Sequence, residues 1–211
     1  LLKAKNFILV AFPMFAVVMK LEEANQFSDP ITGALSTIGA FFLFAAMNLR
    51  NDYNDHMQGL DRIFSNSGSR SIQKGWVTAI QVRLLSNYLL AIGFLFGLPA
   101  LFRYPLVMTI VGLLTVLVLM TINSVQVGMK YQRWTELAVF LLFGPILTVG
   151  YQISCGGKIE EEIVFLGIVT GWFSVFTLHL KNFQQLMQNS QAQFDNTVAF
   201  LGFEKGKKFL V

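Results

Sequence analysis

The chain has 211 residues, of which 54% are hydrophobic and 13% are charged, and its formal net charge is +4. A typical soluble domain has roughly 25% charged residues, so this composition excludes a disordered chain, a disulfide-stapled secreted module and a soluble enzyme. It indicates a single transmembrane domain over residues 1–211. The one cysteine, Cys155, excludes an internal disulfide and a thiolate metal cluster.

Six apolar stretches lack Asp, Glu, Lys and Arg and approach the length of about 20 residues that a spanning helix needs. In chain order they cover residues 6–19, 30–49, 84–102, 104–129, 137–157 and 163–180. None shows the alternation with a period of two residues that a transmembrane barrel requires. The sequence therefore predicts an all-α fold class, a polytopic membrane helical bundle with about six spanning helices.

The basic residues are distributed unevenly over the connections between these stretches. With six crossings, the N-terminus, residues 50–83, residues 130–136 and everything after residue 180 fall on one face, with 13 of the 16 Lys and Arg residues. The positive-inside rule makes that face cytoplasmic in an inner or cytoplasmic membrane. A basic balance of this kind reflects loops at an anionic lipid surface, and no nucleic-acid partner is expected.

The longest polar stretches, residues 50–83 and 181–208, lie on that face and are the predicted location of function. If the second helix continues into the first of them, Asn48, Asp52 and Asp55 share one helical face. Carboxylate and amide oxygens at this spacing suit Mg²⁺, although a solvated helix end has the same pattern. Arg70 and Lys74 follow and are suited to binding phosphate oxygens.

Residues 51–55, with the sequence NDYND, resemble the first aspartate-rich motif of the UbiA superfamily of intramembrane prenyltransferases. The form is that of the naphthoate polyprenyltransferase branch of the menaquinone pathway, and Gly59 and Asp61 extend the match. Residues 68–70, 73–75, 130–131, 136–137, 139–145 and 197–202 are also similar to segments of that branch, in the same order. The resemblance therefore covers essentially the whole chain.

The resemblance implies a helical bundle around a central cavity and an Mg²⁺-dependent enzyme. Such an enzyme ionises a polyprenyl diphosphate, and the allylic cation is attacked by an aromatic acceptor of naphthoate type in quinone biosynthesis. Membrane lipid surrounds the bundle. Carried onto this sequence, the resemblance implies catalytic residues Asp52, Asp55 and Arg70, metal ligands Asp52, Asp55 and Asp61, and substrate-binding residues Asn48, Asn51, Arg70, Lys74, Asn182, Gln185 and Asn189.

The chain departs from the family at the second motif, which reads N-N-x-R-D-x-x-x-D and aligns with residues 181–189. Asn182 is retained, whereas Gln184 replaces the arginine and Gln185 and Asn189 replace the two aspartates. We expect the three amides at 182, 185 and 189 to share one helical face without its negative charge. The resemblance also implies about three further spanning helices beyond Val211.

These departures support an alternative function. The chain is then a catalytically degenerate relative that serves as a structural or quinone- and lipid-binding subunit of a larger membrane complex. The two histidines do not indicate a cofactor protein: His56 is expected at a surface turn, and His179 is expected to be a buried histidine that hydrogen-bonds a carbonyl group.

Overall fold

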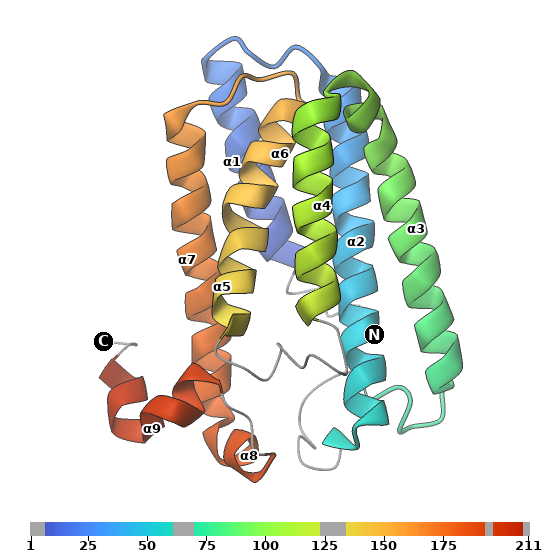
Figure 1. Ribbon diagram of the computed structural model, residues 1–211, viewed down its shortest axis with the longest axis vertical. Helices are drawn as coiled ribbons and strands as arrows, with labels where there is room; N and C mark the ends of the chain where they lie inside the picture. Colours follow the sequence, from blue (N-terminus) through green and yellow to red (C-terminus); the bar gives the residue numbers. More distant parts are fainter. Residues whose placement is uncertain (1–6, 61–69, 123–133, 193–195, 209–211) are drawn as a thin grey trace.

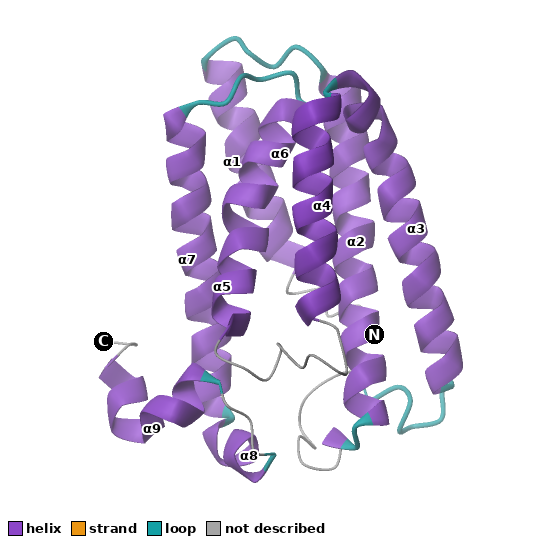
Figure 2. Ribbon diagram, in the orientation of Figure 1, coloured by secondary structure: helices purple, strands orange, loops and turns teal. Residues whose placement is uncertain are grey.

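The computed structural model describes residues 7–60, 70–122, 134–192 and 196–208. Every regular element within these ranges is a helix, as predicted (Figure 2). The elements are α1 (Ile8–Glu23), α2 (Pro30–Met57), α3 (Ala79–Arg103), α4 (Pro105–Ile122), α5 (Trp134–Leu141), the π-helical segment η4 (Leu142–Ile146), α6 (Leu147–Ser154), α7 (Glu161–Gln184), α8 (Leu186–Gln191) and α9 (Thr197–Lys208).

As far as the structure describes them, all six apolar stretches form helices, with α5, η4 and α6 continuing one another as a single helix over Trp134–Ser154. Among the described residues, four helices are long and apolar enough to cross a membrane: α2, α3, Trp134–Ser154 and α7. The helices α1 and α4 are shorter, with 16 and 18 residues. The chain is therefore an integral membrane protein with an all-α bundle.

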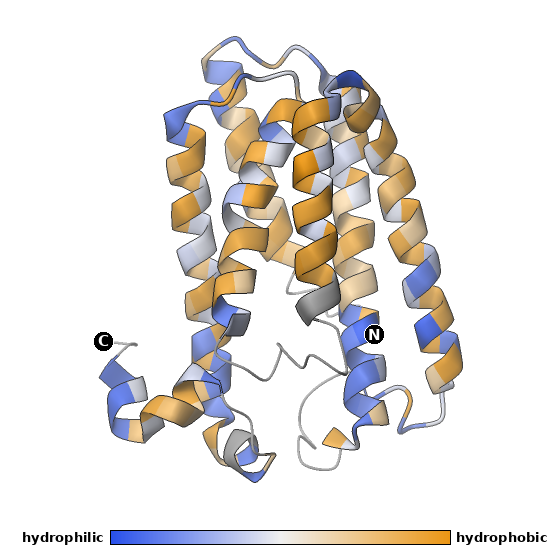
Figure 3. Ribbon diagram, in the orientation of Figure 1, coloured by the Kyte–Doolittle hydropathy of each residue, from blue (hydrophilic) through white to orange (hydrophobic). Residues whose placement is uncertain are grey.

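The helices of the bundle run side by side along its long axis (Figure 1). The α1–α2, α3–α4 and α6–α7 connections meet at the upper end, and α2 and α7 reach the lower end. Hydrophilic residues gather where α2 and α7 end (Figure 3). The two long polar segments therefore leave the bundle at the same end, as the alternation of crossings predicts.

Local sequence determines where α2 and α3 begin. The Asp29 carboxylate accepts a hydrogen bond from the Thr32 backbone N–H at 3.1 Å, and Pro30 occupies the first turn of α2. The Thr78 hydroxyl and the Gln81 side chain form a reciprocal capping box at the start of α3. Both capping residues precede the first residue of their helix, so the charged carboxylate of Asp29 stays outside the apolar part of α2.

A close approach of α7 to the kinked helix α5–η4–α6 depends on glycine. Gly144 has a non-helical backbone (φ −107°, ψ −112°) next to Pro145, which cannot donate a backbone hydrogen bond. A Cβ atom at Gly144 would lie 2.5 Å from the Gly167 carbonyl oxygen and 2.9 Å from Gly171 Cα. The two helix backbones are therefore in direct contact at this level.

Candidate functional site

The helix α2 runs without interruption through the first motif. It ends at Met57, and Gly59 follows with a φ of +70°, a conformation that favours glycine at helix ends. One face of the last turns of α2 therefore carries Asn48, Asp52 and Asp55. This confirms the prediction that the three residues share a face if the helix continues into the polar segment.

The polar groups of this face are mostly shielded from solvent. Asn48 and Asp52 are 7% and 9% exposed, and Asp55 is half-buried. The Asn48 side-chain amide donates to the Phe44 carbonyl oxygen at 3.1 Å, and the Asn51 amide donates to Asp55 Oδ2 at 3.0 Å. These local hydrogen bonds fix the orientation of the amides beside the two carboxylates.

The basic residues lie on a tight turn beyond α2. Arg70 has a φ of +51°, a conformation that is rare for any residue except glycine, and its carbonyl oxygen accepts from the Lys74 N–H at 2.9 Å. The Lys74 ammonium lies 4.7 Å from the centre of the Trp76 ring, a cation–π contact. Gln73 Nε2 lies 3.2 Å from His56 Nδ1, so the turn is held against the last turn of α2.

The donor set of the first motif fits a magnesium ion. Mg²⁺ prefers hard oxygen ligands and typically takes one or two carboxylates, with water and phosphate oxygens completing the shell. Asp52 and Asp55, on one face, supply such carboxylates. No group of three His, Cys, Asp or Glu residues suited to a metal occurs in the described part of the chain, and Asp61 lies outside the described residues.

The second motif is not carried by one continuous helix, so the expectation of a shared face for its three amides is wrong. The helix α7 ends at Gln184, Gln185 has a φ of −108° and a ψ of 20°, and α8 begins at Leu186. Asn182 is therefore in the last turn of α7, whereas Asn189 belongs to α8. Because residues 182–191 contain neither glycine nor proline, the sequence gives no signal for this break.

An apolar cavity of about 270 Å³ lies within the bundle. Its walls come from α1, α2, α3, α4, η4 and α6, and on α2 it extends from Ser36 to Met47, the residue before Asn48. Its volume is just below the range of roughly 300–1,000 Å³ that small-molecule pockets occupy. The cavity therefore reaches the turn of α2 at which the polar face begins.

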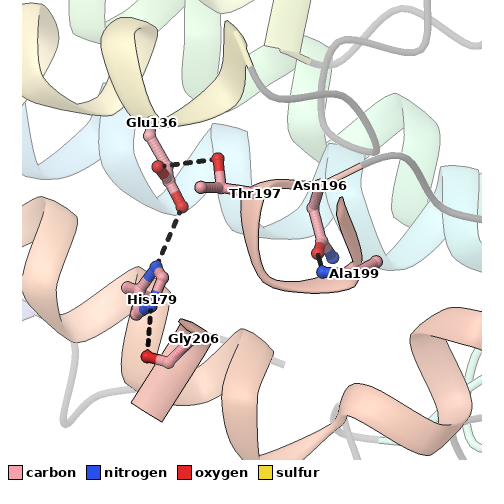
Figure 4. Close-up of polar contacts among 6 residues, drawn as sticks. All are labelled: Glu136, His179, Asn196, Thr197, Ala199 and Gly206. Atoms are coloured by element: carbon pink, nitrogen blue, oxygen red, sulfur yellow. Dashed lines mark hydrogen bonds and ion pairs between the residues drawn. The ribbon is translucent and has the colours of Figure 1, made fainter. Parts of the chain in front are cut away.

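A second polar cluster, which we call the clasp, joins α5, α7 and α9 (Figure 4). It consists of Glu136, His179, Thr197 and Gly206. Glu136 Oε1 lies 3.3 Å from His179 Nδ1, and the Thr197 hydroxyl donates to Glu136 Oε2 at 2.9 Å. His179, which is 4% exposed, places Nε2 3.3 Å from the Gly206 carbonyl oxygen. The expectation of a buried, carbonyl-bonded His179 is confirmed.

Sequence reasoning did not identify Glu136 or Thr197 as partners of His179. A signal for Glu136 exists, because it is the only acid between residues 62 and 159. An acid at the start of an apolar stretch needs a polar partner when it is buried. The sequence does not reveal which residues are the partners, because His179 lies 43 positions and Thr197 61 positions along the chain from Glu136. Only the tertiary structure brings them together.

Residues 10–211 match the UbiA prenyltransferase family. The chain belongs to this family. It is 24% identical over 188 residues to a 1,4-dihydroxy-2-naphthoate octaprenyltransferase of Haemophilus influenzae, with 83% of this chain and 59% of the relative covered. It is 24% identical over 192 residues to a UbiA prenyltransferase domain-containing protein 1 of Dictyostelium discoideum, with 88% of this chain and 58% of the relative covered.

The chain spans less than two thirds of the length of these two UbiA relatives. No solved structure matches it. The part of the UbiA bundle described here brings the face of Asn48, Asp52 and Asp55, the turn with Arg70 and Lys74, and the ends of α7 and α8 to the same end of the molecule (Figure 1).

Proposed function

We propose that this chain carries a site that transfers a polyprenyl group from polyprenyl diphosphate to an aromatic acceptor of naphthoate type in quinone biosynthesis. The observation that carries the proposal is the placement of Asp52 and Asp55 on the helix that also lines the apolar cavity. Membership of a prenyltransferase family and the similarity to a naphthoate octaprenyltransferase support the substrate classes.

In the proposed site, Asp52 and Asp55 hold Mg²⁺, with Asp61 as a further ligand. When bound, the ion stabilises negative charge on the diphosphate oxygens as the carbon–oxygen bond breaks. Arg70 and Lys74 bind the diphosphate, because charge-assisted hydrogen bonds from Arg and Lys to phosphate oxygens are strong. Asn48 and Asn51 orient the ligands, as the Asn51–Asp55 hydrogen bond of 3.0 Å supports.

The apolar cavity receives the isoprenoid tail and keeps water from the allylic cation. Phe44 and Phe143, each 6% exposed, line it and contact each other edge to face at 5.7 Å between ring centres. Aromatic rings in this position stabilise a nearby cation. In the proposed reaction the bond between the allylic carbon and the diphosphate oxygen breaks, and the diphosphate leaves with the electron pair of that bond. The allylic carbon then bonds to a ring carbon of the acceptor, and the ring loses a proton.

The second motif would offer the substrates neutral hydrogen bonds, from Asn182, Gln185 and Asn189.

The test is product formation by the full chain reconstituted in lipid, with Mg²⁺, a polyprenyl diphosphate and dihydroxynaphthoate, followed by chromatography and mass spectrometry. We expect prenylated product from the wild type and from Glu204→Gln, which neutralises an exposed acid of α9. Asp52→Asn and Asp55→Asn should form none. Absence of product from the wild type, or equal product from the Asp52→Asn variant, would refute the proposal.

The second candidate function is a degenerate UbiA protein that acts as a subunit of a larger membrane complex. The neutral second motif favours it, because amides at 182, 185 and 189 stand where the family has an asparagine and two aspartates. A stable, stoichiometric membrane partner that copurifies with an inactive chain would support this function. An active chain that remains monomeric after stringent detergent washing would refute it.

We also propose that the chain resides in the inner or cytoplasmic membrane with its N-terminus and its polar motifs on the cytoplasmic side. The concentration of Lys and Arg at that end supports this orientation. Cys155 is buried, so single cysteines introduced at the exposed Lys207 and Lys158 report on the two ends. A membrane-impermeant maleimide added to intact cells should label the cysteine at 158 and not the one at 207.

A further inference from the structure

Five glycines line the apolar cavity: Gly39, Gly93, Gly97, Gly112 and Gly150. All five lie inside helices and none has the positive φ that would require glycine. A glycine in a helix interior destabilises that helix relative to alanine, because it has more conformational freedom to lose. Each of these positions therefore needs a compensating reason for glycine.

Close helix packing supplies the reason at three of them. A Cβ atom at Gly39 would lie 2.9 Å from the Gly93 carbonyl oxygen, and one at Gly93 would lie 2.8 Å from Leu43 Cδ2. A Cβ atom at Gly150 would lie 2.8 Å from Val111 Cγ1. These glycines allow α2 to approach α3 and α6 to approach α4, so alanine would disturb the bundle.

Gly97 and Gly112 have no such reason. A Cβ atom at either position would meet no atom within 4 Å. Gly97 belongs to α3 and Gly112 to α4, and both border the cavity. Any other side chain at these two positions would occupy part of the cavity, and glycine leaves that space empty.

The cavity has the length and chemistry of a short isoprenoid chain. The residues of α2 that line the cavity lie on one face of the helix, from Ser36 to Met47. At a rise of 1.5 Å per residue, the cavity therefore extends about 17 Å along α2. One extended isoprene unit has four main-chain bonds and a length of about 4.5–5 Å by ordinary bond geometry. About three units therefore fit between the polar end of α2 and Ser36.

We infer that Gly97 and Gly112 are specificity-determining residues that keep the cavity wide enough for about three isoprene units of a branched chain. The inference rests on the proposed function, because it assigns the cavity to the isoprenoid tail. Side chains larger than hydrogen at these positions should shorten the isoprenoid that the cavity accepts, and they should do so without touching the acidic face of α2.

The test uses uncharged isoprenoid alcohols of two, three and four units without Mg²⁺, so the result does not depend on the diphosphate site. Binding to the full chain in detergent is measured by calorimetry for the wild type, Gly97→Leu, Gly112→Leu and the single alanine variants. Ala91→Leu is the matched control, because it adds similar bulk to the exposed outer face of α3. Helical circular dichroism checks that each variant is folded.

For the wild type and Ala91→Leu we expect affinity to rise from two units to three and then to level off. In Gly97→Leu and Gly112→Leu the affinity for the three-unit alcohol should fall by about tenfold or more relative to the two-unit alcohol, the scale of discrimination in an apolar pocket. The alanine variants, whose added methyl meets no neighbour, should remain folded and shift the ratio in the same direction by a smaller amount.

The same length profile in all folded variants would overturn the inference while leaving the prenyltransferase proposal intact. Conversely, a shifted length profile in a chain that forms no prenylated product would support the inference and refute only the catalytic proposal. A wild type that binds none of the alcohols would overturn the inference and the assignment of the cavity to the isoprenoid tail.

Discussion

The clasp offers a stability test that is independent of activity. Glu136 provides acceptor oxygens for His179 Nδ1 and the Thr197 hydroxyl, and the side chains of Glu136 and His179 are 19% and 5% exposed. In Glu136→Ala both groups lose that acceptor in a mostly buried place. A buried polar group without its partner costs about 1–3 kcal/mol, so the free energy of unfolding should fall by about 2–5 kcal/mol.

The matched variant is Glu136→Gln. Its amide oxygen accepts from Thr197, and its amide nitrogen donates to His179 Nδ1 when His179 Nε2 carries its proton and donates to the Gly206 carbonyl oxygen. All three contacts of the clasp are then retained without a charge. We expect this variant to lose about 1 kcal/mol, the net contribution of a typical hydrogen bond.

The assay is reversible denaturant unfolding in detergent, followed by circular dichroism. A double-mutant cycle of Glu136→Ala with Thr197→Val should give a coupling energy of about 0.5–3 kcal/mol, as for residues in one hydrogen-bond network. A loss below about 0.5 kcal/mol in Glu136→Ala, the scale of an ordinary surface substitution, would refute the reasoning. Equal losses in Glu136→Ala and Glu136→Gln would also refute it.

Three further predictions concern other parts of the bundle. Asp52→Asn should abolish Mg²⁺-dependent binding of a non-hydrolysable prenyl diphosphate analogue in a magnesium titration, because the proposed site loses a directly coordinating carboxylate that a neutral amide does not replace in charge; binding equal to that of the wild type contradicts this. Burial raises the pKa of Asp29, but the Thr32 hydrogen bonds and the Arg103 guanidinium lower it more, so its net pKa lies below the ordinary value. The charged carboxylate therefore stabilises the fold above the unfolded pKa of about 3.9. Unfolding measured against pH should show Asp29→Asn less stable than wild type at pH 7, with the difference shrinking as the pH falls below that unfolded pKa; a constant difference contradicts this. Gly144→Ala should lower the unfolding free energy by about 1–3 kcal/mol, because its methyl would meet the Gly167 carbonyl oxygen at 2.5 Å, whereas Gly112→Ala, with open space, should not.

Hydropathy was sufficient to predict the helices of the six apolar stretches, though not α8 and α9, because every spanning segment must satisfy its backbone hydrogen bonds internally and bury few charges. The extension of α2 through Asp52 and Asp55 was also predictable, since residues 31–57 contain no proline and the helix ends only before Gly59. These features depend on the local sequence and on the lipid surroundings. They can be predicted without knowing which helices pack against one another.

The clasp, the break after Gln184 and the different roles of the cavity glycines were not predictable. His179 meets Glu136 and Gly206 only because α5, α7 and α9 converge at one place. Gly93 and Gly97 lie on the same helix one turn apart, yet one is packed against Leu43 and the other faces open space. Such differences arise from tertiary packing, which the spacing of residues along one helix does not determine.

The neutral second motif changes the charge balance that the proposed site has to achieve. In the proposed site the carboxylates of Asp52, Asp55 and Asp61 supply enough negative charge for one divalent ion but not for two, whereas the amides at 182, 185 and 189 add none. A second divalent ion would therefore remain uncompensated by this segment. With one ion, stabilisation of the leaving diphosphate depends more strongly on Arg70 and Lys74, whose turn is held against α2 through Gln73 and His56. The enzyme function thus requires something that the subunit function does not. One ion and this basic turn must together stabilise the negative charge of the leaving diphosphate, a task that a second acidic motif with its own ion would otherwise share.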